Sequence, residues 1–110
     1  MELPNRQRAV VEDAKIRDYL LSSTHPIGHF KATFFTALGF SADRWPELQA
    51  AILSHGQTGV ATQGHESPYV TKYEIRAAIE GPAGRSATVV SVWMIGNDVD
   101  FPTFITAFPG

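Results

Sequence analysis

Two kinds of hydrophobic spacing divide the chain. In the first half, apolar residues recur every three or four positions, which is the period of an amphipathic helix. From residue 69 onward, apolar and polar residues alternate, which is the period of a strand with one buried face. The change of period predicts helices in the first half of the chain and a sheet in the second half.

Three helices are expected before the change of period. The first covers 13–22 and ends before Pro26, because proline cannot donate a hydrogen bond and keeps the preceding residue out of helical geometry. The second covers 29–38 and ends at Gly39, where a glycine followed by an apolar residue is typical of a left-handed cap. The third starts after residue 41 with a proline in its first turn and runs to residue 56.

Three strands and a weaker fourth are expected after the change of period. The clear strands cover 69–80, 85–95 and 103–108, and the weaker one lies within 58–66. The middle strand is apolar on both sides, which indicates a central position in the sheet. The sequence therefore predicts a single α+β domain over 1–110, with three N-terminal helices packed on one face of a C-terminal four-stranded antiparallel meander sheet.

The expected register assigns side chains to the two faces of this sheet. With Glu80 near Ser86 and Ile95 near Thr103, the even-numbered side chains share the face that the helices leave open. These side chains are Lys72, Glu74, Arg76, Val92, Met94, Phe104, Thr106 and Phe108. Such a face is suited to RNA, because aromatic rings stack on bases and cations hold phosphates. Alternatively, the charged residues only solvate the sheet through cross-strand charge pairs.

Composition narrows the classes of function. The chain has 110 residues, a formal net charge of −2 and a pI near 6.0. The whole molecule therefore lacks the basic field that attracts nucleic acid, and any RNA contact must be a local patch. The absence of cysteine excludes disulfides and cysteine-bound zinc. No secretory leader or membrane-spanning run is recognisable, so we expect a cytoplasmic protein without a membrane partner.

The sequence contains no pattern that predicts a site for a metal ion or a nucleotide cofactor. His25 and His29 are four residues apart, but Pro26 and Gly28 stand between them, so they are not expected to share a helical face as zinc ligands. The sequence also lacks a phosphate-binding glycine loop, a dinucleotide-binding glycine motif and a nucleophile elbow. We therefore expect no metal and no cofactor.

Two longer motifs carry a family resemblance over nearly the whole chain. They are HPIGHFKATFFTALGF at 25–40 and GPAGRSATVVSVW at 81–93, accompanied by LPN near the start, DYLL in the first helix and TAFP near the end. With these motifs the chain resembles a bacterial family of domains of unknown function associated with toxin–antitoxin and polymorphic toxin systems. That family is similar in arrangement to ribonucleases of the barnase, RelE and colicin type.

The resemblance implies a set of site residues. The family-like positions are His25, Gly28, Lys31, Arg85, Trp93 and Thr106. Metal-free RNA cleavage needs a base, an acid and cations around the charged phosphorane. The residues expected to be catalytic are Lys31, His25, Arg85 and Thr106. Those expected to bind substrate are His29, Lys72, Glu74, Arg76 and Phe108, with His25, His29 and Glu74 also able to move protons.

Each of these residues has a simpler structural interpretation. His25 before a proline is able to cap a loop through a backbone hydrogen bond, and the stem of Lys31 is able to cover apolar surface. Arg85 could pair with Glu80 or Asp43. Gly28 could serve only the geometry of the backbone, and Trp93 could pack in the core with its indole nitrogen satisfied internally. Thr106 could be present because threonine favours strands.

The sequence thus leaves two functions open. The first is a toxin acting on RNA as a metal-independent ribonuclease, neutralised by a cognate antitoxin or immunity protein. The second is a non-enzymatic interaction domain, namely an antitoxin, an immunity protein or a dimerisation module that could form a homodimer. The acidic pI and the expected exposure of Phe104 and Phe108 favour the second function.

Overall fold

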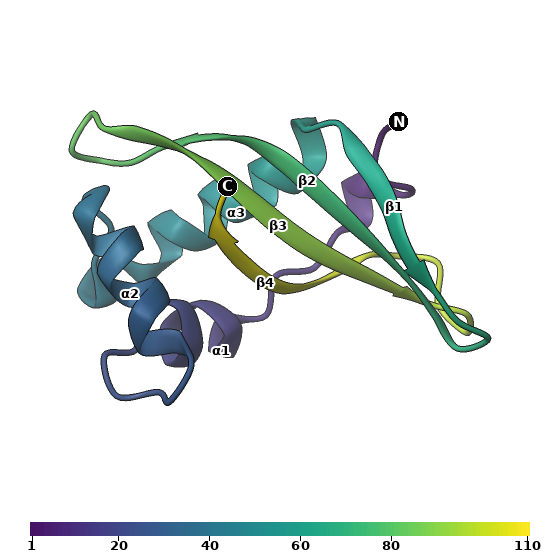
Figure 1. Ribbon diagram of the computed structural model, residues 1–110, viewed down its shortest axis with the longest axis horizontal. Coiled ribbons are helices and arrows are strands. Elements are labelled where there is room, and N and C mark those ends of the chain that lie inside the picture. Colours follow the sequence, from purple (N-terminus) through teal and green to yellow (C-terminus); the bar gives the residue numbers. More distant parts are fainter.

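The computed structural model describes residues 1–110 as an α+β fold with the helices before the strands (Figure 1). The helical elements are η1 (Arg6–Arg8), α1 (Asp13–Lys15), η2 (Ile16–Leu20), α2 (Gly28–Ala37), η3 (Ala42–Arg44) and α3 (Trp45–Thr58). The strands are β1 (Ala61–Glu66), β2 (Val70–Glu80), β3 (Ser86–Gly96) and β4 (Thr103–Pro109). They form one antiparallel sheet in the order β1-β2-β3-β4, so the expected meander of four strands and the central place of β3 are confirmed.

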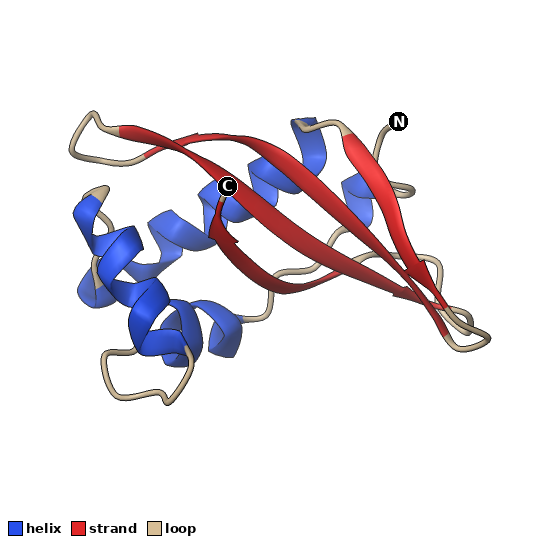
Figure 2. Ribbon diagram, in the orientation of Figure 1, coloured by secondary structure: helices blue, strands red, loops and turns tan.

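The helices leave one face of the sheet uncovered at β1 and β2, while side chains of η2 and α2 reach Thr106 of β4 on that face. Helix α3 lies behind β2 and β3, while α1 and α2 lie beyond β4 toward one end of the molecule (Figures 1 and 2). On the helix-covered face, Ile75, Val89 and Trp93 have no exposed surface. On the opposite face, Glu74 and Arg76 are exposed. We call this second surface the open face.

Trp93 lies at the centre of the core, as the sequence predicts. Its indole Nε1 donates to the Ser91 hydroxyl at 2.9 Å, and its ring meets that of Phe104 edge to face at 5.5 Å between centroids. A Cβ atom at Gly56 would lie 2.4 Å from the indole ring. The absence of a side chain at this position therefore lets α3 pack directly on β3.

A buried histidine completes the polar part of the core. His55 of α3 is 4% exposed and bonds through Nδ1 to the Ser91 hydroxyl at 2.7 Å and through Nε2 to the Ala77 carbonyl at 3.1 Å. Because a carbonyl only accepts, Nε2 carries the proton, and a neutral ring then accepts from Ser91 at Nδ1. Burial is the largest influence on the pKa of His55 and lowers it, against backbone hydrogen bonds to Ala77 and Val89 that raise it.

The helices follow the sequence prediction except in the first helix and at the end of α3, which continues past residue 56 to Thr58. Gly39 has a φ of +102°, and the Phe40 amide donates to the Phe35 carbonyl at 3.2 Å, so the expected left-handed cap is confirmed. The first helix is shorter than expected and widens into a π turn at η2, where the Leu21 amide donates to the Ile16 carbonyl at 3.0 Å. Such turns rotate the side chains that follow them and are frequent at functional sites.

The register of the sheet confirms most of the predicted open face. Glu80 pairs with Ser86 as expected, and the pairings of β2 with β3 place Lys72, Glu74 and Arg76 on one face. Thr106 opposes Val92 and Phe108 opposes Val90, so these two side chains share that face.

The position of Phe104 is where the predicted register was wrong. The register shifts between Val92 and Trp93, so Thr103 opposes Met94 instead of Ile95 and Phe104 opposes Trp93. The extra residue of this β-bulge reverses the side-chain alternation, which the sequence pattern does not show. Phe104 is therefore 1% exposed in the core, and its expected place on the open face was wrong.

No helix combines the length and the apolar character needed to cross a bilayer.

The buried His55 predicts a pH-dependent stability. The unfolded chain takes up a proton as the pH falls through the ordinary value of 6.5, whereas the folded ring, with its lowered pKa, resists protonation. The free energy of unfolding should therefore be at its full value above pH 6.5 and fall below it by up to about 1.4 kcal/mol per pH unit. His55→Gln should cost about 1–3 kcal/mol at neutral pH and remove this component of the slope, as urea unfolding at several pH values would test. Parallel slopes for wild type and variant would contradict the assignment.

Candidate functional site

Three polar side chains from separate elements meet beside the open face. The Tyr19 hydroxyl of η2 lies 3.0 Å from the Thr106 hydroxyl of β4, and Lys31 Nζ of α2 donates to that hydroxyl at 2.5 Å. All three side chains are partly exposed. We call Tyr19, Lys31 and Thr106 the central triad.

Close packing of α2 on η2 fixes this triad. A Cβ atom at Gly28 would lie 2.0 Å from the Tyr19 carbonyl oxygen, so only glycine permits this approach. Lys31 follows one turn later on α2 and lies over the Tyr19 ring, with its Nζ 5.2 Å from the ring centroid. The backbone role expected for Gly28 is therefore what the structure shows, and it serves the position of Lys31.

The surroundings of the triad are cationic. Lys15 Nζ lies 5.6 Å from the centroid of the Tyr19 ring, and Lys31 Nζ also lies 5.8 Å from that of Phe108. No carboxylate pairs with either lysine. The four ion pairs of the protein are elsewhere, between Arg6 and Glu2, Arg8 and Asp100, Arg17 and Asp18, and Arg44 and Glu47. The triad thus forms a local cationic patch in a chain of net negative charge.

This patch changes the acidity of Tyr19. Burial is the largest influence and alone would raise the pKa of the phenol. Hydrogen bonds to Lys31 and Thr106, together with the charges of Lys31 and Lys15, outweigh burial and lower the pKa below its ordinary value of 10.0. Tyr19 is therefore a better proton donor, and more readily a phenolate, than an isolated tyrosine.

His25 borders the triad and also caps α2. Its Nδ1 accepts from the amides of Ile27 at 3.1 Å and Gly28 at 2.9 Å, so the capping role considered for this residue is present. Its ring meets that of Tyr19 edge to face at 5.0 Å. Because Nδ1 accepts, the proton of the neutral ring is on Nε2, where it is available to donate to a ligand.

Two of the expected site residues lie outside this group. His29 bonds through Nδ1 to the His25 carbonyl at 2.8 Å and packs on Phe30 at 3.9 Å between ring centroids, without contacting the triad. Arg85 donates to the Ala37 carbonyl at 3.3 Å, at the end of α2. Ala37 follows Lys31 by six residues, about 9 Å along the helix. The pairings considered for Arg85, with Glu80 or Asp43, are not formed.

The charged residues of β2 lie on the open face, two strands away from Thr106 of β4. None of Lys72, Glu74 and Arg76 forms an ion pair, so the cross-strand charge pairs considered as an alternative are not formed. Glu74 belongs to the cross-strand row that contains Thr106. A shallow hollow of about 400 Å³ adjoins this row, lined by Val60, Thr62, Glu74, Arg76 and Val90.

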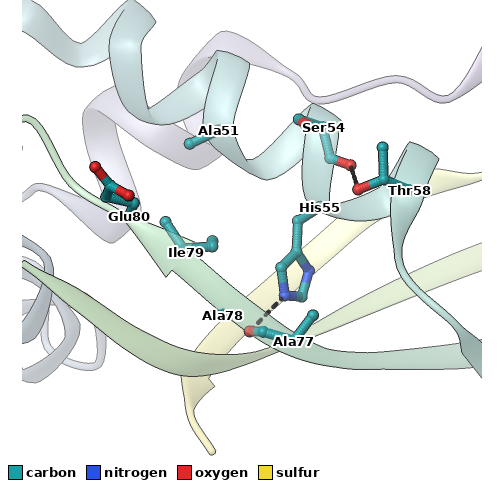
Figure 3. A pocket seen from close by; sticks show the side chains of 8 residues that line it. All are labelled: Ala51, Ser54, His55, Thr58, Ala77, Ala78, Ile79 and Glu80. Atoms are coloured by element: carbon teal, nitrogen blue, oxygen red, sulfur yellow. Dashed lines mark hydrogen bonds between the residues drawn. The ribbon is translucent and has the colours of Figure 1, made fainter.

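A second hollow lies on the helix-covered side of β2, away from the triad. It has a volume of about 200 Å³ between α3 and the end of β2, and Figure 3 shows His55 in its wall, bonded to the Ala77 carbonyl. Both ring nitrogens of His55 already have partners, so this side chain is engaged in the core.

No three His, Asp or Glu side chains lie close enough together to hold a metal ion. The chemistry that the site offers is therefore that of hydroxyl, ammonium and imidazole groups.

Sequence reasoning missed Tyr19 and Lys15 as site residues. Tyr19 falls on the apolar stripe of the first predicted helix, where it carries no signal of a site. Its hydroxyl and the lysine four residues earlier on the same helical face were the available signals. Tyr19 itself lies within the π turn, which the pattern does not show.

Comparison with known proteins adds a family and a fold. Residues 2–110 match a family described as "Domain of unknown function (DUF6883)". No curated protein matches the sequence. Among solved structures, the fold is similar to a chain of the "Contact-dependent growth inhibition toxin - immunity protein complex from Klebsiella pneumoniae 342". The TM-score is 0.69 at 16% identity, over 96% of each chain, so the likeness concerns the fold.

The lowered pKa of Tyr19 can be measured directly. Removing the ammonium in Lys31→Met should raise the pKa of Tyr19, because the hydrogen bond and the positive charge that favour the phenolate are lost. Thr106→Val should raise it by less, since only one hydrogen bond is removed. A pH titration of the tyrosine Cζ resonances by NMR would separate Tyr19 from the other two tyrosines.

Lys72→Met is the matched control for this titration, because it removes an ammonium from the open face without touching Tyr19. The control should leave the pKa of Tyr19 unchanged. Equal shifts in Lys31→Met and Lys72→Met would contradict a direct interaction.

Proposed function

The chain belongs to the DUF6883 family, and from that premise we propose that it is the toxin domain of a bacterial toxin–immunity or toxin–antitoxin system, acting as a metal-independent endoribonuclease. The observation that carries this proposal is the central triad of Tyr19, Lys31 and Thr106 beside an open sheet face. The similarity in fold to a chain of a toxin–immunity complex supports the biological setting and a cognate protein partner.

In this proposal, cations hold the scissile phosphate of the RNA. Lys31 and Lys15 flank the Tyr19 ring and have no carboxylate partner, so their charges are free to stabilise the phosphorane. The Nε2–H of His25 donates to a phosphate oxygen. Lys72, Glu74, Arg76 and Phe108 contact the rest of the RNA on the open face.

Proton transfer follows from the linked hydroxyl and ammonium groups. Tyr19, as the phenolate that the neighbouring cations favour, accepts the proton of the ribose 2′-hydroxyl. The 2′-oxygen attacks the phosphorus, and the bond from phosphorus to the 5′-oxygen breaks as Lys31 gives that oxygen a proton. The products are a 2′,3′-cyclic phosphate and a 5′-hydroxyl. The phenol then returns its proton to the Lys31 amine through the Thr106 hydroxyl, to which both groups are hydrogen-bonded.

A non-enzymatic interaction domain, such as an immunity protein or a dimerisation module, is the second candidate. The net charge of −2 and the pI near 6.0 favour it, because most of the surface would repel RNA. This second candidate gives no role to Tyr19, whose pKa, despite burial, is lowered by nearby lysines that form no ion pair. The two candidates therefore differ in what removal of the triad should do.

Controlled expression in a bacterium tests the toxin proposal. The wild-type chain should arrest growth and, when purified, cleave RNA in the presence of a metal chelator. Lys31→Met, Tyr19→Phe and Thr106→Val should each restore growth and slow cleavage by about 100-fold or more, because each removes a proton-transfer or charge-stabilising group.

Arg85→Met is the matched control, since Arg85 is a cation at the other end of α2. This variant should remain toxic. A wild-type chain that leaves growth and RNA untouched would refute the toxin proposal in favour of the interaction domain.

A further inference from the structure

The hollow on the open face presents an unpaired carboxylate. Glu74 is exposed, has no ion-pair or hydrogen-bond partner, and stands beside Arg76 and Thr62. Val60 and Val90 complete the hollow with apolar surface. A flat ligand can therefore rest on apolar side chains while its edge faces the Glu74 oxygens.

The hollow is in line with the central triad. Thr62, Glu74, Val92 and Thr106 are successive partners across the four strands and form one row on the open face. Neighbouring strands are about 4.8 Å apart, so the backbone of Glu74 is about 10 Å from that of Thr106. A ligand with a phosphate at Lys31 and Thr106 can extend its base along this row toward Glu74.

The chemistry of the carboxylate selects among the four RNA bases. An ionised carboxylate only accepts hydrogen bonds and is best satisfied by two donors side by side. Guanine presents such a pair in its N1–H and its N2 amino group. In adenine, cytosine and uracil each donor on the pairing edge is flanked by an acceptor, which would face a carboxylate oxygen.

We propose that this hollow binds a guanine base of the RNA substrate, with Glu74 accepting from N1–H and the N2 amino group. Arg76, two residues along β2 on the same face, holds a neighbouring phosphate. Because this assignment deepens the proposed ribonuclease function, it makes Glu74 a specificity-determining residue, whereas the central triad performs the cleavage.

The test uses oligoribonucleotides that contain one guanosine, and a matched set in which inosine replaces it. Inosine keeps N1–H and lacks only the N2 amino group. Wild-type protein should cleave beside guanosine roughly 10- to 100-fold faster than beside inosine, as expected for a bidentate base contact. Glu74→Gln should reduce this ratio to near one, because an amide offers only one acceptor.

Glu80→Gln is the matched control, since Glu80 is a carboxylate on the same face of β2 outside the hollow. It should retain the guanosine preference. Cleavage without preference in wild-type protein, or a preference that survives Glu74→Gln, would overturn the guanine site while leaving the ribonuclease proposal intact.

A binding measurement separates the two proposals. NMR titration of the wild-type protein with guanosine monophosphate, which has no bond to cleave, should shift the amide resonances of Thr62, Glu74 and Arg76, and inosine monophosphate should shift them less. If these shifts appear but no RNA is cleaved by the wild type, the base site stands and the ribonuclease proposal fails. If neither nucleotide shifts them, or if both do so equally, the base site is refuted.

Discussion

The β-bulge between β3 and β4 decides which side chains of the last strand are core and which are available to a ligand. Without it, strict alternation would place Phe104, Thr106 and Phe108 on the same face. With it, Phe104 packs against Trp93 while Thr106 faces outward to Tyr19 and Lys31. One extra residue thus supplies both an aromatic ring for the core and a hydroxyl for the site, a role for which bulges beside active sites are known.

The central triad and the adjacent Lys15 place two lysines close to the Tyr19 phenol, and neither lysine forms an ion pair. Elsewhere in the chain, arginines pair with acidic residues, as at Arg8 with Asp100 and Arg17 with Asp18. The close packing of α2 on η2 at Gly28 and the His25 cap at the start of α2 hold Lys31 beside Tyr19. An anionic ligand at this place would supply the opposite charge that neither lysine has in an ion pair of the chain.

Hydrophobic periodicity was sufficient to predict the order and kind of the elements, because long alternating strands and capped helices are specified locally. It also predicted that Lys72, Arg76 and Thr106 share an open face, since the pairing of Glu80 with Ser86 sets the register of β2. It failed where one residue is inserted or one turn is widened, at the bulge before Phe104 and at the π turn before Leu21. These irregularities leave no periodic signal, and both help to position the triad.

Net charge was the main argument against an RNA ligand, yet it describes the field far from the protein. At physiological salt, exposed charges more than about 8 Å apart are largely screened, so a phosphate at the triad responds mainly to Lys15 and Lys31. The four ion pairs lie outside the triad, and within each pair the two opposite charges largely neutralise each other. In the proposed ribonuclease, the acidic remainder of the surface would repel nonspecific nucleic acid and leave specificity to contacts on the open face. A guanine at Glu74 agrees with this separation of phosphate contacts from base contacts. The Glu74 carboxylate repels the phosphates of RNA, and this repulsion is offset only when a base with two adjacent donors faces the carboxylate.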